Sequence, residues 1–142
     1  MGVAALIVLD THTLIWTVEG DGRLGTSASR LIEETVQTDR LAVSAITPWE
    51  IALLVERRRL RLGLDVGEWI AEALALPGVT LIPIEPAITI DSVRLPDEFH
   101  DDPADRFIVA TAGRLKVPLL TADRKILAYS EAGHLRTVDA AG

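Results

Sequence analysis

The chain has 142 residues, 49% of them hydrophobic, and a formal net charge of −7, which fits one globular domain over residues 1–142 that buries roughly two thirds of its unfolded surface. It has no cysteine, which excludes disulfides, thiolate metal sites and cysteine nucleophiles. The negative charge argues against binding nucleic acid by overall attraction, because phosphate binding depends on Lys and Arg.

The first apolar run carries no targeting feature. It reads "ALIVL" (5–9), follows no basic segment and ends at Asp10, so it fits neither a signal peptide nor a membrane span. We therefore expect a cytoplasmic protein that does not contact a membrane.

The first part of the chain predicts two strands separated by two helices. Residues 6–10 form a short β-branched-rich run that ends on an aspartate, as in a strand buried on both faces. Helical spacing follows over 11–20 and again over 26–39. Residues 40–46 then predict the second strand.

The next helix, over 47–60, has a strong start pattern. Thr47 is the expected N-cap, Pro48 takes the first helical position, and Glu50 lies three residues after the cap. This arrangement predicts a capping box between the side chains of Thr47 and Glu50.

The following segment predicts a helix over 64–76, a third strand over 79–84 and a short helix over 86–93, and a loop continues through Pro96.

The last part of the chain alternates in the same way. Asp102 is the expected N-cap of a helix over 104–115, followed by a fourth strand at 117–121 and a helix over 122–133. Residues 135–139 are a candidate edge strand. Strands alternating with helices predict an α/β fold with a mostly parallel sheet of four to five strands, covered on both faces.

Acidic residues follow the strands of this predicted sheet. The members are Asp10, Glu50, Asp102, Asp105 and Asp123. Each alone also fits a helix cap, a first-turn acid or a turn residue. Because ligands of open α/β sheets bind at the carboxyl ends of the strands, we expect the five to share one edge. Clustered carboxylates repel one another unless a cation neutralises them, and all-oxygen sites suit Mg²⁺ or Mn²⁺.

Other acid-rich α/β chemistries do not fit. Haloacid-dehalogenase phosphatases need Asp-x-Asp after the first strand, where this chain has Asp10-Thr11-His12. Response-regulator receivers need an aspartate at the end of the third strand, which here leads into "PIEP". No Gly-x-Gly-x-x-Gly motif directly follows the first strand, and the chain has no Gly-Lys-Ser/Thr phosphate loop.

Four segments in order resemble the PIN-domain ribonucleases, and more narrowly the VapC toxins of VapBC toxin–antitoxin modules. They read "LIVLDTHTLIW", "VSAITPWEIALL", "HDDPADRFIVATA" and "VPLLTADRKI". The resemblance implies a PIN-like three-layer α/β/α sandwich. It further implies that Mg²⁺ or Mn²⁺ is held directly or through water by four acids, Asp10, Glu50, Asp105 and Asp123. Asp102 is a second candidate in the third segment. Many relatives have another acid where this chain has Lys125, which favours one-metal chemistry.

Other residues are assigned by their place beside the acids. Hydroxyls near the family's acids correspond to Thr11, Ser44 or Thr47, and Thr121. Thr11 and Thr121 are candidate substrate contacts, with helix capping or strand-end hydrogen bonding as an equal alternative.

Basic groups supply local positive charge for RNA. Arg57, Arg58, Arg59 and Arg61 cluster together, with a solvated helix end as the alternative. Arg106, Arg124 and Lys125 lie beside the acids and are candidate phosphate contacts, with plain surface exposure as an equal alternative for Arg124 and Lys125.

The histidine and aromatic residues give little further indication of function. His100 is either a contact for the scissile phosphate or an incidental loop residue. Trp16, Trp49 and Trp69 lie on apolar helix faces and are expected in the core, with a groove for a partner as the alternative for one of them.

Together these features predict a metal-dependent endoribonuclease toxin that cleaves single-stranded RNA with a metal-activated water. The resemblance also implies a VapB-like antitoxin that blocks the acidic pocket, and a homodimer. The alternative is a non-catalytic PIN-like module that binds RNA or protein and keeps its acids as caps. A structure-specific DNA nuclease fits less well, because the chain lacks room for the additional DNA-gripping segments.

Overall fold

The computed structural model describes residues 6–38 and 40–142, which form five strands and seven helices. The strands are β1 (Ile7–Leu9), β2 (Leu41–Ser44), β3 (Val79–Ile82), β4 (Leu119–Thr121) and β5 (Thr137–Asp139). The helices are α1 (Thr11–Glu19), α2 (Thr26–Val36), α3 (Ile46–Glu56), α4 (Val66–Leu74), α5 (Pro86–Val93), α6 (Pro103–Leu115) and α7 (Arg124–Ser130). The expected alternation of strands and helices is confirmed.

The strands make one sheet in the order β3-β2-β1-β4-β5, and every neighbouring pair is parallel. Strand β1 lies at the centre, where Val8 pairs with Ala42 on one side and with Leu119 on the other. The candidate edge strand near the carboxyl terminus is β5. A parallel α/β sheet of four to five strands was predicted, and the structure confirms it.

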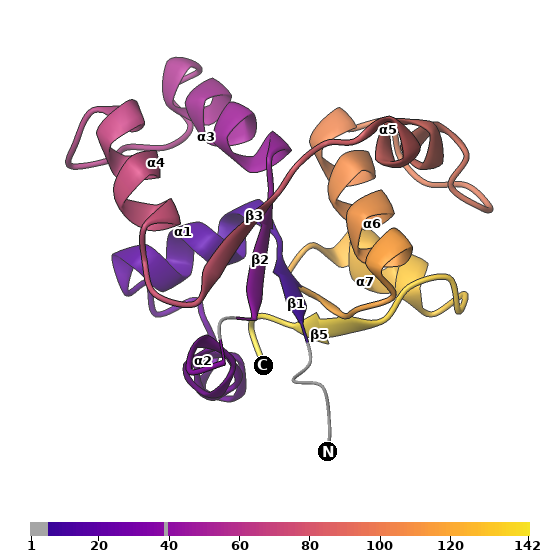
Figure 1. The fold of residues 1–142 in the computed structure, drawn as a ribbon, viewed down its shortest axis with the longest axis horizontal. Coiled ribbons are helices and arrows are strands. Elements are labelled where there is room, and N and C mark those ends of the chain that lie inside the picture. Colours follow the sequence, from indigo (N-terminus) through magenta and orange to yellow (C-terminus); the bar gives the residue numbers. More distant parts are fainter. Residues whose placement is uncertain (1–5, 39) are drawn as a thin grey trace.

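Helices cover both faces of the sheet, as Figure 1 shows. Ile7 and Leu9 of β1 belong to a core cluster with residues of α1 to α4, whereas Val8 belongs to a second cluster with residues of α6 and α7. Successive residues of a strand point to opposite faces, so the uninterrupted apolar run of β1 supplies both cores. The three layers expected from the resemblance are confirmed.

Helix α3 begins differently from the prediction. It starts at Ile46, directly after β2, and its N-cap position is Ala45, which makes no side-chain cap. Thr47 is instead buried in the first turn, with its hydroxyl 3.0 Å from Thr11 Oγ1. The predicted N-cap at Thr47 and its capping box with Glu50 are therefore wrong. The Ile46 amide donates to Ser44 Oγ, and the helix begins two residues earlier than predicted.

The tryptophans divide into two groups. Trp16 and Trp69 are 9% and 4% exposed, as core residues should be, but Trp49 is 48% exposed. The core position expected for Trp49 is wrong, because Trp49 lies on the exposed side of α3, whereas Thr47 and Ile51 occupy its buried side. Among the described residues, no helix is both long and apolar enough to span a membrane.

Candidate active site

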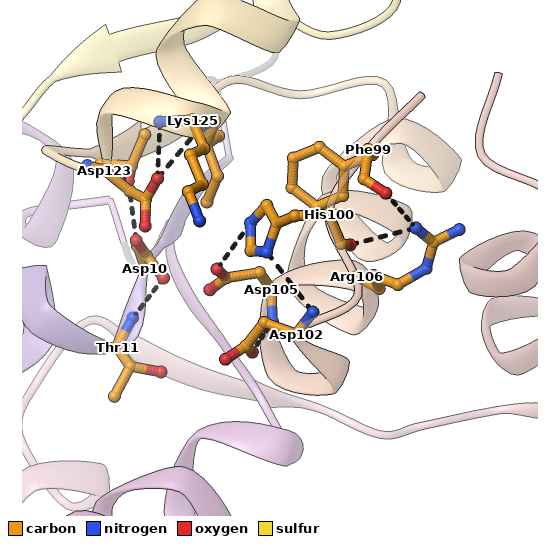
Figure 2. Close-up of polar contacts among 11 residues, drawn as sticks. Asp10, Thr11, Phe99, His100, Asp102, Asp105, Arg106, Asp123 and Lys125 are labelled. Atoms are coloured by element: carbon orange, nitrogen blue, oxygen red, sulfur yellow. Dashed lines mark hydrogen bonds and ion pairs between the residues drawn. The ribbon is translucent and has the colours of Figure 1, made fainter. Parts of the chain in front are cut away.

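The five predicted acids come from different elements but lie at one edge of the sheet. Asp10 follows β1, Glu50 lies in α3, Asp102 and Asp105 begin α6, and Asp123 follows β4. Figure 2 shows Asp10, Asp105 and Asp123 facing a shared space. Burial, together with the negative charges of the other four acids, raises the pKa of Asp105 to about 8. The acids therefore lie close together, as predicted, and they are near enough for their charges to change the pKa of Asp105.

Asp10 is fixed by hydrogen bonds to both carboxylate oxygens. Its Oδ1 accepts from the Thr11 amide at 2.9 Å, and its Oδ2 accepts from the Thr121 hydroxyl at 2.7 Å. Burial raises its pKa, and these two bonds oppose that effect by stabilising the charged form. Asp10 also caps α1, so its structural and site roles coexist.

One carboxylate oxygen of Glu50, the buried Oε1, lacks a hydrogen-bond donor among the described residues. Burial raises the pKa of Glu50, and the charges of Asp10 and Asp102 add to the rise, whereas Thr11 and His12 lower it. Carboxylate oxygens from Glu50, Asp102 and Asp105 lie within 4.8 Å of one another. The cluster is therefore short of positive charge.

A divalent cation fits this arrangement. A buried carboxylate oxygen without a partner is costly, and it becomes favourable when it coordinates a metal. The donor set is entirely oxygen, as hard cations such as Mg²⁺ and Mn²⁺ require. Glu50, Asp102 and Asp105 could hold such an ion together, with Asp10 and Asp123 completing the negative surroundings.

Asp102 and Asp123 both act as caps. Asp102 Oδ1 accepts from the Asp105 amide at 3.1 Å, which confirms the predicted N-cap of α6. Asp123 Oδ1 accepts from the amides of Lys125 and Ile126. In each residue the other carboxylate oxygen makes no protein hydrogen bond among the described residues, so capping leaves it for a further ligand.

Arg106 has a different role from the predicted phosphate contact. Its guanidinium donates to the carbonyl oxygens of Ser92, Phe99 and His100 at 2.8, 2.9 and 3.2 Å. The bonds to Phe99 and His100 hold the loop before α6 (Figure 2), and the bond to Ser92 ties this loop to the end of α5. The guanidinium is thus occupied by backbone carbonyls rather than turned toward the acids.

The loop held by Arg106 places His100 beside the acids. Its Nε2 lies 3.0 Å from Asp105 Oδ2, without hydrogen-bond alignment, and Nδ1 faces the Asp102 amide at 3.4 Å. The sequence did not specify this contact, although "HDDPAD" places a histidine just before the acids.

Two basic side chains border the acidic cluster. A pocket of about 450 Å³ is lined by His100, Asp102, Asp105, Asp123, Arg124 and Lys125. Arg124 and Lys125 are exposed at the start of α7, and Figure 2 shows Lys125 directed toward the acids. In contrast, Thr11 and Thr121 are completely buried, so their hydroxyls reach other site residues and not the pocket.

Comparison with known proteins now identifies the fold family. Residues 7–132 match the PIN domain. The chain belongs to the PIN-domain family. This PIN domain is 36% identical over 126 residues to Ribonuclease VapC22 of Mycobacterium tuberculosis, covering 87% of this chain and 91% of the relative. The predicted resemblance to PIN domains and VapC proteins is confirmed.

Solved structures support the same fold. This PIN domain is similar to the crystal structure of VapBC2 from Rickettsia felis bound to a DNA fragment from their promoter, with a TM-score of 0.69, 14% identity, and coverage of 94% of this chain and 97% of that one. A toxin–antitoxin complex from Klebsiella pneumoniae gives a TM-score of 0.60 at 22% identity, with the same coverage.

Proposed function

We propose that this PIN domain is a VapC-type toxin, an endoribonuclease that depends on Mg²⁺ or Mn²⁺ and hydrolyses phosphodiester bonds of single-stranded RNA. The observation that carries the proposal is the set of carboxylate oxygens from Glu50, Asp102 and Asp105 within 4.8 Å of one another, one of them buried without a partner. The 36% identity to Ribonuclease VapC22 supports RNA as the substrate.

The acids of the chain would hold the cation, with Asp10, Glu50, Asp105 and Asp123 as the ligands that the resemblance implies and Asp102 added by the geometry. A bound divalent ion would polarise the phosphodiester and lower the pKa of an attacking water. Thr121 fixes the orientation of Asp10 through its 2.7 Å hydrogen bond. Asp105, with a pKa near 8, holds a proton at neutral pH when the surrounding charge is not neutralised.

Arg124 and Lys125 are the substrate contacts that the geometry favours. Both are exposed at the rim of the acidic pocket, where an RNA phosphate would approach. Arg106 is left out, because its donors are bound to backbone carbonyl oxygens of α5 and of the loop before α6. Thr11 and Thr121 become positioning residues, since neither is accessible to a substrate.

The partner proposed for this chain is a VapB-like antitoxin that blocks the acidic pocket. The similar structures from Rickettsia felis and Salmonella typhimurium are VapBC complexes, which supports this partner. We further propose that the toxin works in the cytoplasm, as a homodimer of single-domain chains.

The test is cleavage of a mixed RNA pool by the purified chain with Mg²⁺, Mn²⁺ or chelator. The wild type should cut only with a metal, and Asp10→Asn should lose at least about 100-fold in rate. Circular dichroism and antitoxin binding should stay unchanged in that variant. A wild type that leaves RNA intact under all three conditions, yet binds it equally well in each, would instead be the non-catalytic module.

A further inference from the structure

A second pocket lies beside the acidic centre, between α3 and the start of α6. Its volume is about 290 Å³, and its lining includes Trp49, Leu53, Arg57 and Arg59. Glu50 and Asp102 also line it, and both belong to the acidic cluster. The pocket therefore continues directly from the candidate active site.

Helix geometry places these side chains on one side of α3. Trp49, Leu53 and Arg57 are spaced by four residues, so they follow one face of the helix. Arg58 then takes a left-handed conformation with φ of 57°. The Arg58 amide donates a hydrogen bond to the Val55 carbonyl oxygen, and the Arg59 amide donates one to the Leu54 carbonyl oxygen. These bonds end the helix and turn Arg59 back toward the pocket.

The pocket combines an exposed aromatic ring with positive charge. Trp49 is 48% exposed, although it is large and apolar. Arg57 and Arg59 are exposed, and neither takes part in an ion pair between described residues. In a chain with a net charge of −7, two arginines without an acidic partner form a local site for an anion.

We propose that this pocket binds a nucleotide of single-stranded RNA next to the phosphate that is cut. The base stacks on the indole of Trp49, and Arg57 and Arg59 contact flanking phosphates, a combination suited to single strands without sequence preference. The inference rests on the proposed function, because the acidic centre sets which phosphate is cut. The positive charges of Arg57 and Arg59 favour RNA over an antitoxin peptide. Continuity favours it too, since Glu50 and Asp102 line the pocket and also belong to the acidic cluster.

Binding is measured first, with a short labelled single-stranded RNA in chelator, so that cleavage does not interfere. Trp49→Ala should weaken binding about 5- to 100-fold, the usual effect of losing a base stack. Trp49→Phe should stay within a few-fold of wild type. RNA should quench the indole fluorescence of the wild type but not of Trp49→Phe, because Trp16 and Trp69 are buried.

The arginines are tested by salt dependence. Arg57→Gln and Arg59→Gln should each lower the slope of log affinity against log salt by about 0.7. Arg58→Gln is the matched control, because Arg58 is an exposed neighbour that does not line the pocket, and its slope should equal that of wild type.

The outcomes separate this inference from the proposed function. If the wild type cuts RNA but the Trp49, Arg57 and Arg59 variants bind RNA like wild type, the pocket assignment is overturned and the nuclease remains. If these variants lose only the antitoxin, the occupant is a peptide and the RNA assignment also fails. If RNA binds through the pocket without being cut, the pocket still binds single-stranded RNA, but its place beside a cut phosphate fails together with the nuclease proposal. A wild type that does not bind RNA overturns both.

Discussion

Thr121 is the residue that joins two of the acids. Its hydroxyl donates to Asp10 Oδ2 at 2.7 Å and accepts from the Asp123 amide at 3.0 Å. One side chain at the end of β4 thus orients the acid after β1 and the turn that carries the acid before α7. A hydroxyl with both a donor and an acceptor role is needed here, and no aliphatic side chain can replace it.

Thr121→Val is therefore predicted to impair both stability and activity. The change keeps the shape but leaves Asp10 Oδ2 without its donor, which costs about 1.5–3 kcal/mol for a hydrogen bond to a charged group. RNA cleavage should fall about 10- to 100-fold, as for residues that orient a metal ligand. Urea denaturation and cleavage rates measure the two effects. Thr121→Ser should restore most of both, and a valine variant with wild-type activity would show that Asp10 needs no orientation.

Some residue positions could be predicted from the sequence and others could not. The acids were predictable because each follows a strand or opens a helix. The role of Thr47 was not, because "TPWE" satisfies the local rules of a capping box, whereas the burial of Thr47 against Thr11 depends on packing between α1 and α3. Trp49 was misplaced for a related reason, since the apolar pattern of α3 does not show which side meets the sheet.

At the scale of elements, helix termini control where the site residues lie. Asp10, Asp102 and Asp123 each cap the helix that follows them, so the caps hold the acids at fixed positions. The sequence predicted these helices well, with ends that differ by a few residues. The end of α3 was predicted late, because the left-handed turn at Arg58 occurs at an arginine and not at the glycine that usually indicates it.

Alanine substitutions at two glycines are predicted to change stability in opposite directions. Gly113 lies inside α6, and a Cβ there would meet nothing within 4 Å, so Gly113→Ala should stabilise the protein by about 0.5–1 kcal/mol. Gly78 has φ of +84°, and a Cβ there would lie 2.5 Å from the Val36 carbonyl oxygen. Gly78→Ala should therefore destabilise by more than about 1 kcal/mol. The midpoint of urea denaturation of each variant, compared with wild type, measures these effects. Equal shifts of the midpoint in the two variants would contradict the argument from backbone conformation.

At the scale of the whole molecule, the strand order determines which acids meet. Chain order alone does not show that β4 lies beside β1, with β2 on the opposite side. The first three strands extend the sheet to one side of β1, and the chain then returns to add β4 on the other side, so the strand order reverses between β1 and β4. Crevices at such points are where open α/β sheets bind ligands. Asp10 and Asp123 follow these two strands. The site was predictable as a set of residues, but its centre required the topology.

The crowded acids should make the stability of the metal-free protein depend on pH. Burial and neighbouring charges raise the pKa of Asp105 from 3.8 to about 8, and the pKa values of Asp10 and Glu50 are raised as well. The folded state then binds more protons than the unfolded state between about pH 4 and pH 8, so the free energy of unfolding in chelator should fall as pH rises through this range.

Metal binding should reverse this loss. Divalent ions bind deprotonated carboxylates, so Mn²⁺ should stabilise the protein most at the upper end of the range, by about 2.7 kcal/mol at a hundredfold excess over its dissociation constant. Urea denaturation at about pH 5, 7 and 8, with chelator or Mn²⁺, measures both effects. Asp105→Asn should flatten the pH dependence in chelator and weaken the response to Mn²⁺. Stability that rises with pH in chelator would show that the acids are not held in mutual repulsion, and the case for a cation at this edge of the sheet would fail with it.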